Sequence, residues 1–299
     1  MAELSRKQFD ILETLATSET PLSQRDLSKA SDCSLGTVNK LVKELTEMNY
    51  INEGVITQEG LNALEPYKAQ RAIFIAAGFG SRLAPITFNT PKPLIRVHGT
   101  RIIDHLIDAC LQAGIEDIYI VRGYLAEQFD QLLYKYPMVK FLENPVYNEA
   151  NNISSSLVAR HLLSNAYVFE ADLLLSNPAI IKKYHYSSEF LAIKTERTDD
   201  WCFKVKDGII KEEKVGGEGS NIWQMVGISY WSEKDGEKLC EDIPEVYSSP
   251  GGKERYWEQV PLVYKKENYA VSVAECKYED IVEIDTFNEL KQIDKTYDI

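Results

Sequence analysis

The stretch AIFIAAGFGSRLAPITFNTPKPL, residues 72–94, decides the fold of most of this chain. It begins with an apolar run, 72–77, which is typical of a buried β-strand. Gly78 and Gly80 follow directly, and the cations Arg82 and Lys92 come next. Because α/β sheets bind ligands at the carboxyl ends of their strands, this position predicts a ligand-binding loop.

The loop is typical of a triphosphate site and differs from two other glycine-rich patterns. No GK[ST] follows the glycines, so it is not a Walker loop, and Leu83 stands where the dinucleotide fingerprint has its third glycine. Backbone N–H groups from Gly78 to Ser81 can bind phosphate oxygens, and Arg82 and Lys92 can neutralise them.

Outward from this loop, strands and helices alternate. Apolar patterns predict a helix over 102–110, ended by Gly114, and a further helix over 126–134. Strands are predicted at 117–121, 139–141 and 166–170. This alternation predicts a Rossmann-like α/β fold with a mainly parallel mixed sheet. Beyond residue 190 we expect hairpins, with a turn at Asp207-Gly208 and a flexible loop over 215–220.

Residues 1–68 have a different pattern, which predicts three helices, a short strand pair and a last helix over 59–64. Ser5 and Ser23 are expected to cap the first two helices, with Asp26 completing a capping box. The segment SKASDCSLGTVNKLVKELTEMNYI, residues 28–51, resembles winged helix-turn-helix domains of bacterial transcription regulators. We therefore expect a winged-helix domain over 1–68 and a second domain over 69–299.

The charge of the chain argues against nucleic acid as its main partner. The sequence has 33 Lys and Arg against 46 Asp and Glu, a net charge of −13. Residues 1–68 hold seven basic and eleven acidic residues, which leaves −4 there and −9 in the rest. A DNA-binding domain normally presents a cationic face. A dimerisation or regulatory role is favoured for residues 1–68, and a local basic patch with Lys40 and Lys43 leaves DNA binding open.

The composition indicates in which compartment the protein works and argues against a membrane-spanning protein. At 44% hydrophobic residues the 299-residue chain can bury real cores, yet no apolar run reaches the roughly 18–20 residues that span a bilayer. The five cysteines are scattered and without CxxC spacing, which is typical of reduced thiols. We expect a cytoplasmic protein without a membrane or zinc partner, and homodimerisation stays open.

The segment from Gly78 to Leu94 reads G-x-G-S-R-L-x-P-x-T-x-x-x-P-K-x-L. It resembles the signature of nucleotidyltransferases that make sugar- and choline-nucleotides, enzymes with a GT-A-like fold. The resemblance implies catalytic roles for Arg82, Lys92 and Asp172, and Mg²⁺ held by Asp172 and Asp285. It implies a nucleotide site formed by Ala76, Ala77, Gly78, Gly80, Ser81, Arg82, Lys92, Gly123, Tyr124, Asn152 and Ser156.

Further segments are similar to bacterial CTP:phosphocholine cytidylyltransferases: 123–129, 151–157, 200–201, 256–258 and 283–285. This likeness implies conversion of CTP and phosphocholine to CDP-choline and pyrophosphate. A quaternary ammonium donates no hydrogen bonds, so its recognition relies on aromatic faces and carboxylates. Asp200, Trp201, Tyr256, Trp257 and Glu258 supply these groups. Tyr230 and Trp231 alternate along a strand, so at most one of them can face the site.

Two kinds of alternative remain open. One is another enzyme of the same chemistry, acting on a sugar 1-phosphate, phosphoethanolamine or an aminophosphonate. The other is a winged-helix transcription regulator whose second domain only senses a nucleotide. Retention of Gly78, Arg82, Lys92, Asp172 and Asp285 argues against the regulator, because a sensor could lose the metal carboxylates.

Overall fold

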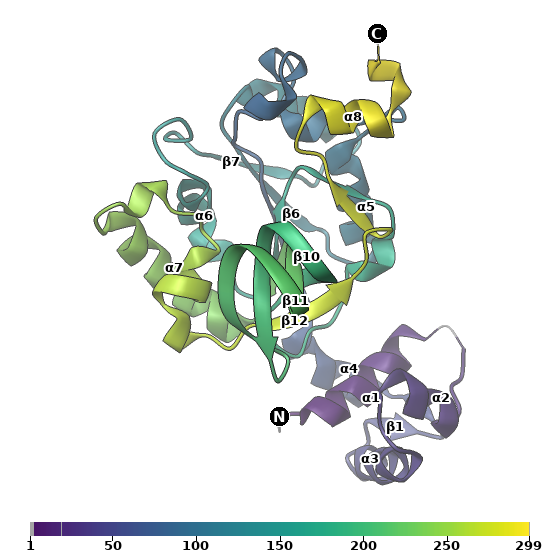
Figure 1. Cartoon of the computed structure of the whole chain (residues 1–299). Helices are drawn as coiled ribbons and strands as arrows, with labels where there is room; N and C mark the ends of the chain where they lie inside the picture. Colours follow the sequence, from purple (N-terminus) through teal and green to yellow (C-terminus); the bar gives the residue numbers. More distant parts are fainter. Residues whose placement is uncertain (1–2, 19, 299) are drawn as a thin grey trace. The chain divides into compact units, whose positions relative to one another are not determined.

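The computed structural model describes residues 3–18 and 20–298 and divides into two compact units (Figure 1). The first unit contains the residues up to Lys68 together with Tyr184–Tyr186, and the second contains Ala69–Lys183 and the chain from Ser187 onward. Within the described residues, none of the helices combines the length and the apolar character needed to cross a bilayer.

The first unit is a winged helix-turn-helix, as the sequence predicts. Its helices and strands are α1 (Arg6–Thr17), α2 (Gln24–Ala30), α3 (Leu35–Glu47), β1 (Ile51–Asn52), β2 (Val55–Ile56) and α4 (Gln58–Leu64). Ser5 and Ser23 form capping boxes at α1 and α2, with Gln8 and Asp26 as the third helical residues. These reciprocal bonds satisfy backbone N–H groups that the first helical turn leaves unpaired, so the short helices begin at defined residues.

Three residues from far along the sequence complete the core of the first unit. Tyr184 is only 4% exposed among the apolar side chains of α1, α3 and α4. Tyr186 stacks on Tyr67 with ring centroids 5.8 Å apart, and its hydroxyl donates to the Leu4 carbonyl. The winged-helix fold is therefore built from two separate stretches of chain.

The second unit is built on a seven-stranded mixed sheet with the order β10-β12-β11-β8-β3-β6-β7. Strands β8, β3, β6 and β7 are parallel to their neighbours within this group, β10 is parallel to β12, and β11 is antiparallel to β8. This confirms the mainly parallel mixed sheet. The strands are β3 (Arg71–Ile75), β6 (Asp117–Arg122), β7 (Lys140–Glu143), β8 (Ala166–Glu170), β10 (Glu189–Lys206), β11 (Ile209–Trp231) and β12 (Ser272–Cys276).

Alternation along the strands gives this sheet a core on each face. In β3, Ala72 and Phe74 join one apolar cluster and Ile73 joins the other. The first cluster includes residues of α5 (Ile102–Gln112), and the second includes residues of α6 (Ile153–Ala159) and α7 (Glu233–Ser248). In Figure 1, α5 lies on one side of the sheet, and α6 and α7 lie on the other. Because side chains of a strand point alternately to its two faces, a strand buried on both sides reads as one apolar run.

Four local expectations can be compared with the observed elements. The turn at Asp207-Gly208 joins β10 to β11 as expected, but the flexible loop expected over 215–220 is wrong. Those glycine-rich residues lie inside β11 and pair with β10 across several register shifts. The segment 126–134 forms a 3₁₀ helix. Tyr230 and Trp231 are both buried, on opposite faces of β11.

The remaining elements frame the carboxyl end of the sheet. The short strand β9 (Leu173–Leu175) pairs antiparallel with β13 (Ile281–Glu283), and α8 (Phe287–Ile293) follows β13. A small hairpin, β4 (Arg96–Val97) and β5 (Thr100–Arg101), precedes α5. The β9–β13 pairing brings a late segment of the chain beside the end of β8, which positions the carboxylates described below.

Candidate active site

A cavity of about 640 Å³ lies at the carboxyl ends of β3 and β8, entirely within the second unit. The glycine loop and Lys92 form one part of its wall, and the ends of β8 and β13 contribute carboxylates. The part of the wall formed by residues 151–152, 200–201, 256 and 258 supplies amide, aromatic and carboxylate side chains. A cavity of this size at this edge of an α/β sheet fits a small organic ligand.

The glycine loop needs a glycine at residue 80 for two reasons. Gly80 has a φ of +61°, in the left-handed region that side chains disfavour. A Cβ there would also lie 3.0 Å from the Cβ of Lys92 and 3.1 Å from the Cγ2 of Thr87. At Gly78, by contrast, an added Cβ would meet no atom within 4 Å, which leaves the backbone open to a ligand.

Lys92 is the central cation of the cavity. The residue is only 8% exposed, and its Nζ lies 2.9 Å from Asp172 Oδ2 and 3.2 Å from Asp285 Oδ1. Burial opposes the charge on Lys92, but the two carboxylates outweigh it, so the pKa of Lys92 is raised. Arg82, which is largely exposed, donates to Asp285 Oδ2 at 2.8 Å. Three predicted catalytic or metal residues thus meet at one point around Lys92.

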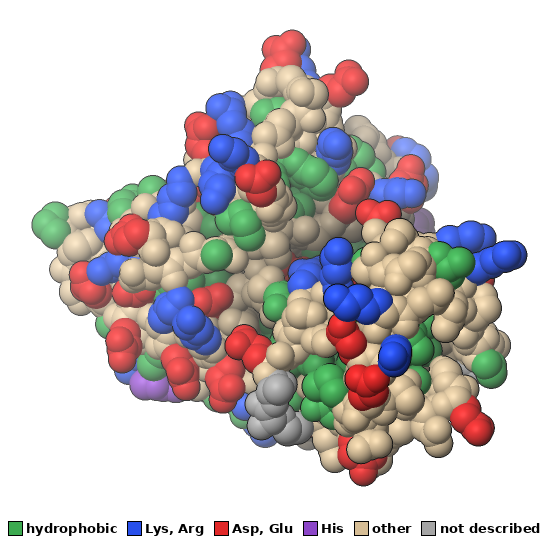
Figure 2. All heavy atoms as spheres, turned by 90° about the horizontal axis from the view of Figure 1, so that it is seen from below, with side chains coloured by type: hydrophobic (Ala, Val, Ile, Leu, Met, Phe, Trp, Pro, Cys, Tyr) green, Lys and Arg blue, Asp and Glu red, His purple; other side chains and the backbone are tan. Residues whose placement is uncertain are grey.

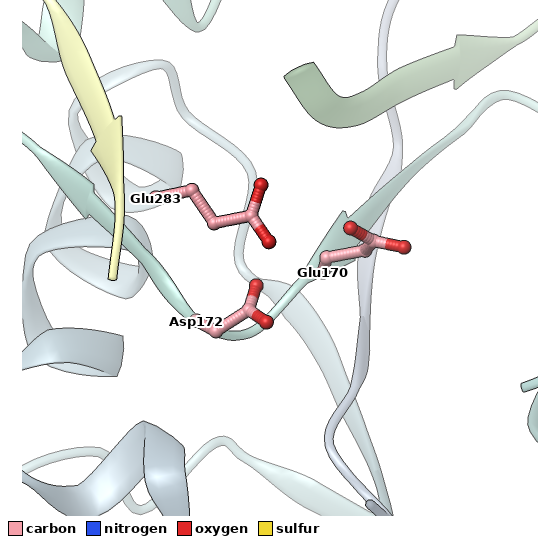
Figure 3. Close-up of side chains that lie close together, drawn as sticks. All are labelled: Glu170, Asp172 and Glu283. Carbon is pink, nitrogen blue, oxygen red and sulfur yellow. The ribbon is translucent and has the colours of Figure 1, made fainter. Parts of the chain in front are cut away.

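Asp172 also belongs to a carboxylate cluster with Glu170 and Glu283, and the carboxylate of Glu283 lies next to that of Asp172 in Figure 3. One oxygen of each of these three side chains lies within 4.8 Å of the others. Burial, followed by the charges of Asp172 and Asp285, raises the pKa of Glu283 to about 9. Asp172 Oδ1 is buried and has no hydrogen-bond partner among the described residues. Oxygen ligands with spare negative charge are what Mg²⁺ prefers, so this donor set fits the ion.

Glu170 occupies space that a glycine of the neighbouring strand leaves free. A Cβ at Gly227 of β11 would lie 2.3 Å from Glu170 Oε2. Burial, followed by the charge of Asp172, raises the pKa of Glu170 well above its usual range. Sequence reasoning missed Glu170 as a site residue, although its place two residues before Asp172 at a strand end was a usable signal. Glu283 was likewise passed over, although it precedes Asp285 by two residues.

The predicted substrate residues separate into two groups. Trp201 and Tyr256 line the cavity with ring centroids 5.5 Å apart at 66°, and Asp200 and Glu258 lie beside them. Trp257 is instead buried in the core against Phe190 and Trp231. Because Trp257 follows Tyr256 directly, the two side chains leave the backbone in different directions. The larger ring, Trp257, packs in the core between α7 and the sheet.

Several predicted nucleotide residues lie outside the cavity lining. They are Ala77, Gly123, Tyr124 and Ser156, whereas Ala76, Gly78, Gly80, Ser81 and Asn152 are in the lining. Tyr124 donates from its hydroxyl to the Thr87 carbonyl, and its N–H donates to the Ala77 carbonyl. Ser156 is buried and donates to the Ile153 carbonyl. Gly123 lies against the ring of Tyr147.

Phe79 is a lining residue that sequence reasoning set aside. It is 46% exposed, and its ring lies 5.1 Å from that of Tyr124 and 5.4 Å from that of Tyr147. The aromatic character of residue 79, between two glycines, was its only signal in the sequence.

Comparison with known proteins agrees with this geometry. The family model "Nucleotidyl transferase" matches residues 71–185, and the model "Winged helix-turn-helix DNA-binding" matches residues 4–52. The solved structure of the CTP:phosphocholine cytidylyltransferase LicC of Streptococcus pneumoniae superposes with a TM-score of 0.69 at 31% identity, covering 77% of this chain and 99% of that one. The second unit is therefore a nucleotidyl transferase.

Sequence relatives narrow the class. The 2-aminoethylphosphonate cytidylyltransferase of Lancefieldella rimae is 38% identical over 229 residues, 76% of this chain and 92% of that protein. The choline-phosphate cytidylyltransferase of Streptococcus pneumoniae is 33% identical over 231 residues, 75% of this chain and 97% of that protein. The chain belongs to the cytidylyltransferase family, with an added winged-helix unit.

Proposed function

We propose that the protein transfers a cytidylyl group from CTP, with Mg²⁺, to the phosphate or phosphonate of a small cationic compound. Phosphocholine is the substrate expected from the sequence, and the similarity to a 2-aminoethylphosphonate enzyme supports an aminoalkylphosphonate as the second candidate. The observation that carries the proposal is the position of Lys92 between Asp172 and Asp285, beside the open glycine loop.

The glycine loop and its cations are suited to the triphosphate. Backbone N–H groups from Gly78 to Ser81 would bind phosphate oxygens, and exposed Arg82 would move from Asp285 to the β- and γ-phosphates. Lys92, held at the bottom of the cavity, would stabilise charge on the α-phosphate or the incoming phosphate.

The carboxylates are suited to Mg²⁺. Asp172 and Asp285 are the ligands implied by the family, and the free Oδ1 of Asp172 with nearby Glu283 and Glu170 supports a cation here. When bound, Mg²⁺ would neutralise phosphate charge and orient the α-phosphate. In the structure, Lys92 and Arg82 neutralise part of the negative charge of these carboxylates, and a bound Mg²⁺ would neutralise it in the same way.

No general base is needed for this chemistry. An oxygen of the substrate phosphate attacks the α-phosphorus of CTP in line, the bond to the β-phosphate oxygen breaks, and pyrophosphate leaves. Because the attacking group is already an anion at neutral pH, the protein must mainly align two polyanions and stabilise the charge that develops.

One assay tests the proposal. Pyrophosphate release is measured with CTP, UTP, dTTP and ATP, each combined with phosphocholine, phosphoethanolamine, 2-aminoethylphosphonate and glucose 1-phosphate. We expect turnover with CTP and a cationic phosphate or phosphonate, and none with glucose 1-phosphate. Turnover confined to glucose 1-phosphate, or no turnover with any pair, would contradict the proposal.

For the winged-helix unit we propose a dimerisation or regulatory role in a cytoplasmic enzyme. The two lysines of α3 lie near glutamates one turn on, with Lys40 to Glu44 at 3.7 Å and Lys43 to Glu47 at 3.9 Å. On the face drawn in Figure 2, basic and acidic side chains are interspersed. Such a surface offers little net attraction to phosphates.

A further inference from the structure

Glu258, which is buried, and Glu213, whose two carboxyl oxygens are buried, are neighbouring acidic groups at the aromatic part of the cavity. Glu258 lines the cavity and is only 3% exposed. Glu213 lies in β11 opposite Phe203 of β10, and Val215 lies opposite Trp201. Because residues two apart in a strand share a face, Glu213 lies on the same face of this hairpin as Trp201. Glu258 is the charged neighbour that acts on the carboxyl of Glu213.

Among the described residues, the Glu213 carboxyl has no hydrogen-bond donor, and the Glu258 carboxyl has only its own backbone N–H and Asn152. Oε1 and Oε2 of Glu213 are both buried without a partner. Glu258 accepts a side-chain bond at the long distance of 3.5 Å, from Asn152 Nδ2. Burial raises the pKa of Glu258 to about 7, and burial with the nearby Glu258 raises the pKa of Glu213 to about 8. Buried acceptors with few donors are costly, so a ligand that supplies N–H groups to Glu258, the member of the pair that lines the cavity, would be favoured here.

The aromatic part of this wall is open. Trp201 and Tyr256 contribute two rings at a steep angle, while Trp257 packs in the core. A trimethylammonium group is best held by aromatic faces on several sides, since its methyl groups donate no hydrogen bonds. A primary ammonium needs acceptors, and its three N–H groups match carboxylate oxygens. The wall therefore suits an ammonium with hydrogens better than a methylated one.

We infer that Glu258, with the neighbouring Glu213, selects substrates with a primary ammonium head group over those with a trimethylammonium. Glu258 would accept hydrogen bonds from the ammonium directly. Glu213 is a positioning residue, since it does not line the cavity and acts through Glu258. This inference rests on the proposed function and narrows it to aminoalkyl phosphates and phosphonates.

The test compares phosphoethanolamine with phosphocholine, which differ only in the three N-methyl groups. With CTP, we expect wild-type kcat/KM to be at least about tenfold higher for phosphoethanolamine, because a site built around N–H groups rejects a ligand lacking them. Glu258→Gln should lower kcat/KM for phosphoethanolamine by about 10- to 100-fold, mostly through KM, because the lost hydrogen bond involves charged groups. Glu213→Gln should lower it by a smaller factor, because Glu213 acts only through Glu258. Phosphocholine kinetics should change by less than about threefold.

Matched variants separate this role from a structural one. Glu212→Gln changes the adjacent, half-exposed carboxylate, which pairs with Lys204 at 2.9 Å, and should leave both substrates unaffected. Glu213→Asp keeps a carboxyl group at this position and should restore part of the selectivity. A wild-type preference for phosphocholine, or an equal loss for both substrates in Glu213→Gln, would overturn the inference alone. Absence of turnover with any cationic phosphate or phosphonate would overturn the proposed function and this inference with it.

Discussion

Replacing Glu213 with glutamine should change how folding stability depends on pH, in the absence of substrate. The pKa of Glu213 is raised from 4.5 to about 8, chiefly by burial. Between these values the folded protein holds a proton that the unfolded chain releases, so the free energy of unfolding falls as pH rises. At about 1.36 kcal/mol per pH unit, and with the proton half lost at pH 8, this one group costs about 2 kcal/mol between pH 6 and pH 8 and up to about 5 kcal/mol in all.

Urea denaturation at pH 6, 7, 8 and 9 measures this effect. Glutamine has the same shape and no titrating proton, so the free energy of unfolding of Glu213→Gln should fall by about 2 kcal/mol less than that of wild type between pH 6 and pH 8. The pKa of Glu258, raised to about 7, leaves a pH dependence common to both proteins, so the difference between their curves is the informative quantity. Parallel curves for wild type and Glu213→Gln would refute the reasoning, because Glu213 would then already be ionised at pH 6. Glu212→Gln serves as the control and should follow wild type.

Four further outcomes are expected. Lys92→Ala should lower kcat by about 10²- to 10³-fold and change KM for CTP by less than about fivefold, because its charge acts mainly on the transition state; normal turnover would sink that role. Chelation of divalent ions should abolish pyrophosphate release and Mg²⁺ should restore it, whereas activity that survives exhaustive chelation would exclude the carboxylate cluster as a metal site. Gly227→Ala should lower the free energy of unfolding by about 1–3 kcal/mol, because the new methyl group meets Glu170; an unchanged denaturation midpoint would show that Glu170 moves freely. The whole protein should show no saturable binding to mixed-sequence duplex DNA at low salt, because the lysines of α3 lie near glutamates. Saturable binding would instead show that the winged-helix unit binds DNA.

The sequence predicted those parts of the fold and site that depend on local patterns. The apolar run before Gly78, the alternating strands and helices, and the capping boxes at Ser5 and Ser23 are all encoded within a few residues. Arg82, Lys92, Asp172 and Asp285 were found from a signature and its order along the chain, and the structure brings them together.

What could not be predicted depends on register and on distant packing. The glycine-rich segment 215–220 resembles a loop, yet the long pairing with β10 holds it as strand. The same pairing places Glu213 on the same face of the hairpin as Trp201, and no local pattern specifies it. Trp257 and Tyr256 are equivalent in sequence, but the core takes one ring and leaves the other to the cavity.

The two-part construction of the winged-helix unit has a consequence for proteolysis. The chain passes between the units after Lys68, again before Tyr184 and again after Tyr186. A single cut between residues 68 and 69 would leave the N-terminal fragment holding Tyr184 and Tyr186 in its core, so the two pieces should stay together until denatured. Deleting residues 1–68 would instead expose Tyr184 and Tyr186 of the remaining chain to solvent. Because the first unit consists of two separate stretches of the chain, removing it intact would require changes at both stretches of the sequence.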